Sequence, residues 1–356
     1  MKKALIISGI FWDDTWQRHQ NVAKFLAESG FSVDFLGGVK TSSVTFNKVI
    51  SYLGKSRKGQ TVKNTVPDNL RELSVFNLPY EILSQFSLSK LTTSGLHKYY
   101  DLVICYVPSP LTKKLLNHIE FEQLIYDCVR NFEGWEGISK NVVAYESKLA
   151  QVASRIWVDS YFLKDRFERS YQDKVTQLFP TVNRLYNFPV KETRSIKHVG
   201  FFGSVSKHFD IMLLPMFAKL GIKLHLWGVD ELGIAEKYEH VIYHGYETDE
   251  RKLLNLVYKQ CDALIIPYVG NMDGVIPAKL FQSLSLNLPV FISDFYDSRK
   301  LDNVLYVYES VSTLAVKLQD FDYSEFETRL PMADELLEKS TLESFKNAIM
   351  QDLQIR

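Results

Sequence analysis

The sequence predicts an α/β protein of two domains, each built on a parallel sheet with helices on both faces. First, 356 residues are enough for two domains with separate hydrophobic cores. Second, short apolar runs alternate with helical patterns along most of the chain, which is typical of parallel sheets. Third, the composition changes at residues 180–197, where two prolines and several charges indicate a linker.

The first half opens with a strand, a loop, a helix and a second strand. The strand Ala4–Ser8 leads into an aromatic and acidic loop, and a helix follows from Arg18 to Ser29. A right-handed crossover of this kind is typical of nucleotide-binding sheets, but the loop lacks the G-x-G-x-x-G fingerprint of dinucleotide sites. Further strands are predicted at residues 31–36, 73–77, 102–106, 124–126, 156–158 and 175–178, and helices at 140–153 and 161–171.

The second half repeats the alternation after the linker. Strands are predicted at residues 198–203, 223–227, 241–243, 263–266 and 290–292, and a terminal helix from Pro331. The predicted boundaries are therefore a first domain at 1–185, a linker at 186–197, a second domain at 198–330 and C-terminal helices at 331–356.

The segment 261–294 carries the clearest chemical signal. A buried strand, a polar loop and an amphipathic helix that starts near Pro277 follow one another. The loop and the helix start lie at the carboxyl edge of the sheet, where backbone N–H groups attract anions. Lys279 and Gln282 lie one turn apart on one side of this helix, and such a pair suits a nucleotide diphosphate and its ribose. A plain amphipathic helix with a solvent-facing lysine explains the same pattern.

This segment resembles the donor-binding element of bacterial glycosyltransferases with the GT-B architecture, in which two Rossmann-like domains face each other across a cleft. The pattern P-x-K-hydrophobic-x-E, then G-x-P-V, stands here as P-A-K-L-F-Q at 277–282 and N-L-P-V at 287–290. Gln282 replaces the acid that takes the ribose hydroxyls, and Asn287 replaces the glycine. The K-x-x-Q form is similar to the glucuronosyltransferase of xanthan assembly and to teichuronic acid transferases.

The resemblance extends to other donor residues. The strand end F-F-G-S-V-S-K at 201–207 resembles the first turn of the donor domain, where a backbone turn approaches a diphosphate. A glycine-containing connection that serves only the backbone geometry explains this sequence equally well. Tyr246, which follows the predicted strand 241–243, corresponds to a position that lies near the nucleotide base in the transferases that this segment resembles. The predicted donor-binding residues are Gly203, Ser204, Lys207, Tyr246, Asp273, Lys279 and Gln282.

The catalytic residues are expected in the first domain. Asp127 follows a predicted strand and resembles the first acid of the Y-D-x-x-D motif of surface-polysaccharide transferases, in which an acid takes the acceptor proton. Arg130 replaces the second acid, and Glu133 is an alternative base. The sequence W-Q-R-H-Q at 16–20 resembles a first-domain signature and makes His19 a further candidate. Helix capping explains Asp127 and His19 without catalysis. The predicted acceptor-binding residues are Asp13, Asp14, Arg18 and Arg130.

Composition narrows the class of protein. Apolar residues make up 46% and charged residues 24% of the chain, and 42 basic residues balance 42 acidic ones, which does not favour nucleic-acid binding. Three cysteines without metal-ligand spacing predict reduced thiols and a cytoplasmic location. The apolar start is too short for a signal peptide, and no run of about 18 apolar residues predicts a membrane span.

One stretch is strongly basic. No acid occurs between Asp34 and Asp68, and the region 40–63 interleaves apolar residues with Lys40, Lys48, Lys55, Arg57, Lys58 and Lys63. Such a region suits peripheral contact with anionic lipid at the inner face of the membrane, at about 1 kcal/mol per basic group. A solvated loop accounts for the same composition.

The expected function is transfer of a hexose from a nucleotide diphosphate donor to a polyprenyl-diphosphate-linked or growing surface glycan. UDP is the nucleotide favoured for the donor. No cofactor and no metal ion are expected, since no His/Cys/Asp cluster has metal spacing and no D-x-D element stands at a strand end. Two alternatives stay open: a UDP-sugar 2-epimerase of the same fold, and a nucleotide-sugar-binding partner without activity. Gln282 and Arg130, which stand where related enzymes have acids, favour the second.

Overall fold

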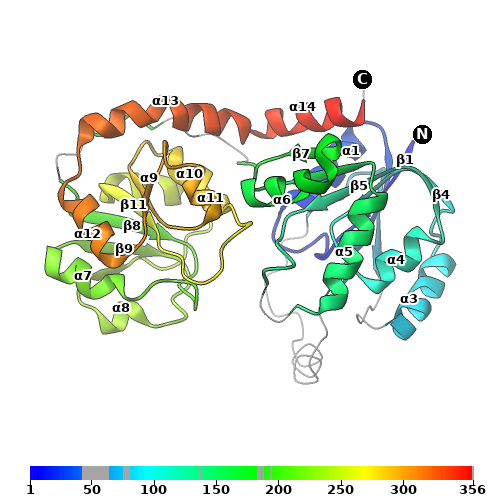
Figure 1. The fold of residues 1–356 in the computed structure, drawn as a ribbon, viewed down its shortest axis with the longest axis horizontal. Helices are drawn as coiled ribbons and strands as arrows, with labels where there is room; N and C mark the ends of the chain where they lie inside the picture. Colours follow the sequence, from blue (N-terminus) through cyan, green and yellow to red (C-terminus); the bar gives the residue numbers. More distant parts are fainter. Residues whose placement is uncertain are drawn as a thin grey trace. The chain divides into compact units, whose positions relative to one another are not determined.

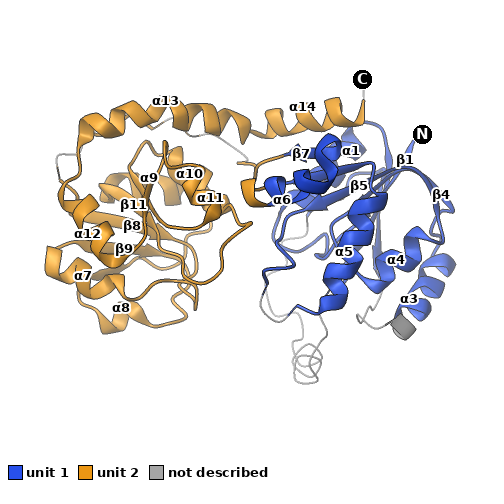
Figure 2. Ribbon diagram, viewed as in Figure 1, with its two compact units in different colours: residues 1–158, 163–177 blue, residues 159–162, 178–356 orange. Residues whose placement is uncertain are grey.

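The computed structural model describes residues 1–41, 64–74, 81–135, 138–182, 186, 188–192 and 195–354. The chain forms two compact units (Figure 2). Unit 1 contains Met1–Val158 and Leu163–Gln177, and unit 2 contains Asp159–Phe162 and Leu178–Arg356. Most of the predicted basic region lies outside the described residues, and the domain boundaries drawn from the sequence stay predictions.

Unit 1 contains a parallel sheet of seven strands in the order β3-β2-β1-β4-β5-β6-β7 (Figure 1). The order reverses between β1 and β4, so these two neighbouring strands lead to loops that run in opposite directions along the sheet. The strands are β1 (Lys3–Ile7), β2 (Ser32–Gly37), β3 (Leu70–Ser74), β4 (Tyr99–Cys105), β5 (Glu120–Cys128), β6 (Arg155–Val158) and β7 (Val175–Gln177). The helices are α1 (Arg18–Glu28), α3 (Glu81–Thr93), α4 (Pro110–Leu116), α5 (Lys140–Val152), α6 (Tyr161–Tyr171) and the short η1 (Gln172–Lys174).

The central strands of unit 1 are apolar because the sheet is covered on both faces. Ala4, Leu5, Ile6 and Ile7 are all fully buried, although successive side chains point to opposite faces. The predicted strand at 73–77 is displaced, since β3 begins at Leu70 and pairs in parallel with β2.

Unit 2 contains a parallel sheet of six strands in the order β10-β9-β8-β11-β12-β13, which reverses between β8 and β11 (Figure 1). The strands are β8 (His198–Phe202), β9 (Lys223–Trp227), β10 (Val241–Tyr243), β11 (Ala263–Ile266), β12 (Val290–Ser293) and β13 (Tyr306–Tyr308). The helices are α7 (Leu213–Leu220), α8 (Ile234–Lys237), α9 (Glu250–Gln260), α10 (Ala278–Leu284), α11 (Tyr296–Arg299), α12 (Val311–Gln319), α13 (Tyr323–Lys339) and α14 (Leu342–Leu353).

Two hydrophobic clusters cover the two faces of this sheet. Leu264 and Ile266 of β11 pack in one cluster with side chains of α9 and α10. Ala263 and Ile265, which alternate with them, pack in the other cluster with side chains of α7 and α12. The packing fixes α10 against the sheet, which places the polar residues of that helix near the strand ends.

The terminal helix starts earlier than the sequence predicts. Pro331 lies inside α13, which begins at Tyr323 after Asp322 caps it by accepting a hydrogen bond from the Ser324 N–H at 2.9 Å. A second helix, α14, starts after Thr341. The predicted start at Pro331 is therefore wrong, because the helix already begins at Tyr323 and continues through the proline.

Asn287 explains one departure from the glycosyltransferase pattern. Its φ of 50° lies in the left-handed region, where the pattern has glycine. Asparagine tolerates this conformation better than other residues with a side chain. Its side-chain amide also donates a hydrogen bond of 2.6 Å to the carbonyl of Phe188. The turn between α10 and β12 therefore keeps the backbone form of a glycine turn.

Substitution of this residue tests the backbone requirement. Asn287→Gly and Asn287→Ala both lose the amide hydrogen bond, but only alanine places a Cβ in the left-handed region. We expect Asn287→Ala to have a free energy of unfolding about 1 kcal/mol below that of Asn287→Gly, as measured by urea denaturation. An alanine variant as stable as the glycine variant would contradict this account of the turn.

Candidate functional site

The site in unit 2 lies at the carboxyl ends of β8 and β11, where the strand order reverses. Loops that leave such a point run to opposite sides and leave room for a ligand, which is where open α/β sheets bind their ligands. Gly203 follows β8 directly, and Tyr268 follows β11 after one proline.

Lys279 of α10 reaches this point. Its Nζ lies 4.0 Å from the ring centroid of Phe201 and 5.5 Å from that of Tyr268. A Cβ built on Gly203 would lie 2.4 Å from the same nitrogen, and Gly203 has a φ of +128°. Glycine is therefore favoured here by its backbone conformation, and a side chain at this position would displace the flexible end of Lys279. The structure brings together the two elements that the sequence predicted to bind a diphosphate.

The charge of Lys279 is not neutralised within the described part of the chain. No carboxylate or hydrogen-bond acceptor there pairs with its ammonium group, which two aromatic rings adjoin. Burial lowers the pKa of Lys279 to about 8. A buried cation without an anion is unfavourable, and a bound anion would relieve this cost. The solvent-facing lysine of the plain-helix interpretation is not observed.

Glycines also allow the backbones that follow β8 and β9 to approach each other closely. A Cβ on Gly228, after β9, would lie 2.3 Å from the carbonyl oxygen of Gly203. The Gly203 N–H donates to the Trp227 carbonyl, and the Gly228 N–H donates to the Gly245 carbonyl, both at 2.8 Å. The position of the Gly203 turn beside Lys279 therefore depends on Gly228.

The other predicted donor residues are placed differently. Ser204 and Lys207 are exposed, as is Tyr246. Asp273 accepts a hydrogen bond of 2.9 Å from the Tyr296 N–H and so supports its own loop. Their roles in binding stay predictions.

Gln282 has a partner that the sequence did not indicate. Its Nε2 donates a hydrogen bond of 2.6 Å to Oε1 of Glu250, the first residue of α9. The side-chain NH₂ group of Gln282 therefore already donates a hydrogen bond within the protein, whereas the sequence predicts that both ends of this side chain bind ribose hydroxyls. No local pattern joins two residues 32 positions apart on different helices.

Asp297 was also missed by sequence reasoning. It is buried, with 1% of its surface exposed, and burial raises its pKa. One carboxylate oxygen accepts from the N–H groups of Tyr161 and Phe162, and the other accepts from the Gly274 N–H at 2.9 Å. Asp297 thereby holds the loop that leads into α10.

In unit 1, the predicted base and a predicted acceptor residue form one ion pair. Arg18 contacts Asp127 through Nε–Oδ2 at 2.9 Å and Nη2–Oδ1 at 2.8 Å. Asp127 is fully buried. Burial raises the pKa of Asp127, and the charge of Arg18 opposes this rise. Asp127 lies within β5 and does not cap a helix, so that structural explanation does not apply.

His19 lies beside this pair, at the reversal point of the unit 1 sheet. Its Nδ1 is 2.8 Å from the hydroxyl of Ser8, which follows β1, and its ring stacks on Tyr106, which follows β4, at 3.7 Å and 14°. Burial and the charges of Arg18 and Arg130 lower the pKa of His19 to about 3. The imidazole is therefore neutral at physiological pH.

The remaining candidates lie nearer the surface of unit 1. Asp14 is exposed and accepts a 2.7 Å hydrogen bond from the Phe11 N–H within its own turn, and Asp13 is exposed as well. The Arg130 guanidinium lies 3.9 Å from the Trp135 ring centroid. Glu133 is exposed, which makes it the more accessible of the two predicted bases. No observation assigns these residues a role.

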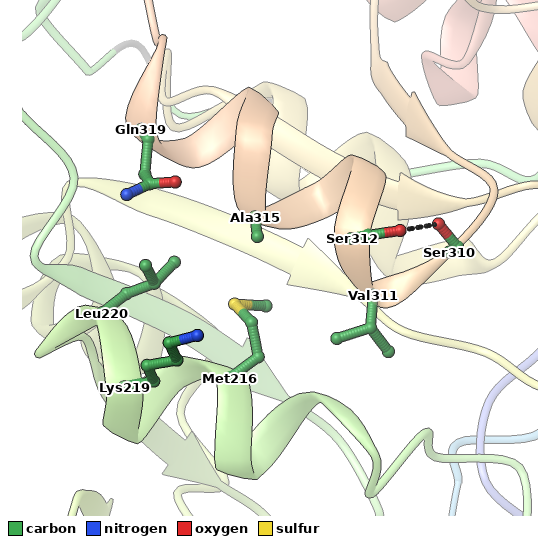
Figure 3. A pocket seen from close by; sticks show the side chains of 8 residues that line it. All are labelled: Met216, Lys219, Leu220, Ser310, Val311, Ser312, Ala315 and Gln319. Carbon is green, nitrogen blue, oxygen red and sulfur yellow. Dashed lines mark hydrogen bonds between the residues drawn. The ribbon is translucent and has the colours of Figure 1, made fainter.

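A separate groove lies between α7 and α12 of unit 2 and has a volume of about 740 Å³ (Figure 3). It is lined by Met216, Lys219, Leu220, Ser310, Val311, Ser312, Ala315 and Gln319. None of the predicted site residues lines it. Across the residues that the structure describes, no group of three His, Cys, Asp or Glu side chains could hold a metal ion. In the same ranges no helix is long and apolar enough to cross a bilayer.

Comparison of this chain with known proteins supports the fold. Neither the protein-family models nor the curated protein sequences give a match. Among solved structures, the sucrose-phosphate synthase of Thermosynechococcus elongatus is 14% identical with a TM-score of 0.66, covering 99% of this chain and 98% of the other. Anabaena HepE in complex with UDP and glucose is 12% identical with a TM-score of 0.64. The lipopolysaccharide outer core galactosyltransferase WaaB is 13% identical with a TM-score of 0.64, and each match covers 99% of both chains.

These likenesses span the whole chain, and both parallel sheets agree with the predicted class. The α/β fold of the GT-B type is therefore confirmed.

Two glycines at strand ends allow a matched test of the site's geometry. Gly228→Ala places a Cβ against the Gly203 carbonyl, whereas Gly245→Ala, also at a positive φ, has no atom within 4 Å. We expect Gly228→Ala to displace the Gly203 turn and to lower the thermal unfolding temperature by several degrees more than Gly245→Ala. Differential scanning fluorimetry checks this. Equal shifts would show that the close approach at Gly228 is unimportant.

Proposed function

We propose that this chain is a glycosyltransferase that moves a hexose from a UDP-linked donor onto a lipid-linked or growing cell-surface glycan. Unit 2 binds the donor, and unit 1 supplies the acceptor residues and the base. One similar structure is a complex with UDP and glucose, and another is a lipopolysaccharide outer core galactosyltransferase, and both agree with this proposal.

The observation that carries the proposal is the buried ammonium of Lys279 at the β8–β11 reversal point. It lies against the Gly203 turn and has no counter-ion in the described part of the chain. A diphosphate supplies the missing charge, and exposed hydrogen-bond donors of the turn add to its binding.

The same lysine accounts for the leaving group. As the glycosidic bond breaks, negative charge develops on the UDP diphosphate, and a cation fixed beforehand in a partly dry site stabilises it. In this proposal Lys279 supplies the positive charge that a metal ion supplies in other transferases, so no metal is required. Exposed Lys207 in the turn after β8 is a second source of charge.

The proton of the acceptor hydroxyl goes to a carboxylate of unit 1. Asp127 and Glu133 are the two candidates, and they differ in accessibility. Asp127 acts as the base only if acceptor binding opens its pair with Arg18, whereas Glu133 is already exposed. The acceptor proposed is a polyprenyl-diphosphate-linked oligosaccharide, met at the inner face of the cytoplasmic membrane by the basic region 40–63.

A catalytically silent, nucleotide-sugar-binding partner is the second candidate. One observation favours it, because the buried carboxylate of Asp127 is held on both oxygens by Arg18. UDP binding without UDP release in the presence of lipid-linked acceptor would identify this function. Conversion of UDP-N-acetylglucosamine in the absence of acceptor would identify a 2-epimerase instead.

Removal of the lysine charge tests the donor site. Lys279→Ala should raise the Kd for UDP roughly 10- to 100-fold, since hydrogen bonds to charged groups contribute about 1.5–3 kcal/mol. Isothermal titration calorimetry measures this. Lys219→Ala, an exposed lysine of the α7–α12 groove, is the matched control and should bind UDP as the wild type does. Unchanged affinity in Lys279→Ala would reject the assignment of the site.

Two carboxamide variants identify the base. Asp127→Asn should abolish release of UDP from the UDP-sugar in the presence of acceptor, while calorimetric UDP binding by unit 2 persists and an unchanged near-UV circular dichroism spectrum shows that unit 1 is folded. Glu133→Gln should retain turnover. The reverse pattern moves the base to Glu133 and leaves Asp127 as the residue that orients Arg18.

A further inference from the structure

The side chains of Gln282 and Glu250 form a pair beside the proposed diphosphate site. The amide nitrogen of Gln282 donates to one carboxylate oxygen of Glu250 at 2.6 Å. Gln282 lies one turn after Lys279 on α10, about 4.5 Å further along the helix axis. This is the direction in which the ribose follows the diphosphate if the nucleotide lies along α10.

The chemistry of the pair fixes how each group is oriented. An ionised carboxylate only accepts hydrogen bonds, so Gln282 must turn its NH₂ group, and not its carbonyl, toward Glu250. The side-chain carbonyl oxygen of Gln282 and the second carboxylate oxygen of Glu250 have no partner within the described residues. The pair therefore offers two adjacent acceptors, one of them charged.

We infer that Glu250 is a ribose-binding residue and that it supplies, from α9, the carboxylate that α10 lacks at Gln282. Two adjacent acceptors match the two hydroxyls of a ribose, which both donate hydrogen bonds. The inference rests on the proposed function, because it assumes that a nucleotide diphosphate occupies the Lys279 site. It makes the 2′-hydroxyl a determinant of donor choice.

The backbone around Glu250 supports a fixed position for this carboxylate. Asp249 caps α9 by accepting a 3.0 Å hydrogen bond from the Lys252 N–H, which sets the start of the helix. Glu250 is half-buried, and Gln282 restrains its side chain. A carboxylate held in this way loses little conformational freedom when a hydroxyl binds it.

The test compares UDP with 2′-deoxy-UDP by isothermal titration calorimetry. We expect the wild type to bind UDP at least about tenfold more tightly, because the deoxynucleotide leaves a charged acceptor without its hydroxyl. Glu250→Gln should bind UDP more weakly and bring the ratio of the two Kd values close to one. Glu247→Gln removes an equal charge nearby, from an acid paired with Lys252, and should keep the wild-type ratio.

A charge swap separates a specific pair from general electrostatics. Gln282→Glu alone places two carboxylates in contact and should weaken UDP binding, although it restores the acid of the glycosyltransferase pattern. The double variant Glu250→Gln with Gln282→Glu re-forms an amide–carboxylate pair and should recover the preference for UDP. Tighter UDP binding by the Gln282→Glu single variant would overturn the inference.

The remaining outcomes distinguish the inference from the function on which it rests. If the wild type binds neither nucleotide, the proposed function fails. If the wild type binds UDP and 2′-deoxy-UDP equally, or if Glu250→Gln keeps the wild-type ratio, the proposed function stands and Glu250 is not a ribose-binding residue.

Discussion

The proposed donor site depends on one unfavourable feature, a largely buried lysine ammonium at the edge of a sheet that no anion of the described residues neutralises. Lys279 cannot reach water freely because Phe201 and Tyr268 adjoin it, and burial lowers its pKa. Several other features follow from this position. The ammonium lies in the space that a side chain at Gly203 would enter, and the backbone of Gly203 leaves no room for a side chain at Gly228. The core beneath α10 holds the lysine in place.

A cation kept in this state is suited to charge that appears during a reaction. Much of its desolvation precedes the arrival of the ligand, so an anion has less water to displace from it. In the proposed function, nucleotide binding and stabilisation of the leaving group both depend on the Lys279 ammonium. Substrate affinity and reaction rate are then coupled through this one side chain.

The proposed ribose-binding carboxylate belongs to Glu250 of α9, whereas the glycosyltransferase pattern has its acid on the helix that corresponds to α10. At Gln282 the local pattern departs from that of similar transferases, and the sequence alone suggests a weaker or inactive site. In three dimensions Glu250 lies in hydrogen-bond contact with that glutamine. A motif that covers one helix cannot record this, because the second residue belongs to a different helix.

Prediction from the sequence succeeded where the signal was local. The strands β9, β10 and β11 have the predicted bounds, since short apolar runs between polar residues suffice to mark buried parallel strands. Gly203 and Lys279 were predicted separately as donor-binding residues, and the structure places them side by side. The start of α13 was wrong because a proline inside a helix resembles one at its start.

Long-range partners could not be predicted. Asp297 binds three backbone N–H groups that lie in two other parts of the chain, and its own neighbours in sequence give no sign of them. Arg18 and Asp127 were assigned separate roles, although they form one buried ion pair. The Arg18–Asp127 contact arises from the sheet order, which brings the carboxyl ends of β1 and β5 to the same edge of the unit 1 sheet.

Proton uptake on UDP binding tests the central claim most directly. At pH 8 Lys279 is about half protonated, and a bound diphosphate raises its pKa, whereas the phosphate of UDP, with a pKa of about 6, is already ionised. Calorimetry in buffers of different ionisation enthalpy should therefore show uptake of about half a proton per UDP in the wild type and none in Lys279→Arg, which is always charged. Equal uptake by both proteins, or no binding of UDP to the wild type, would contradict the account.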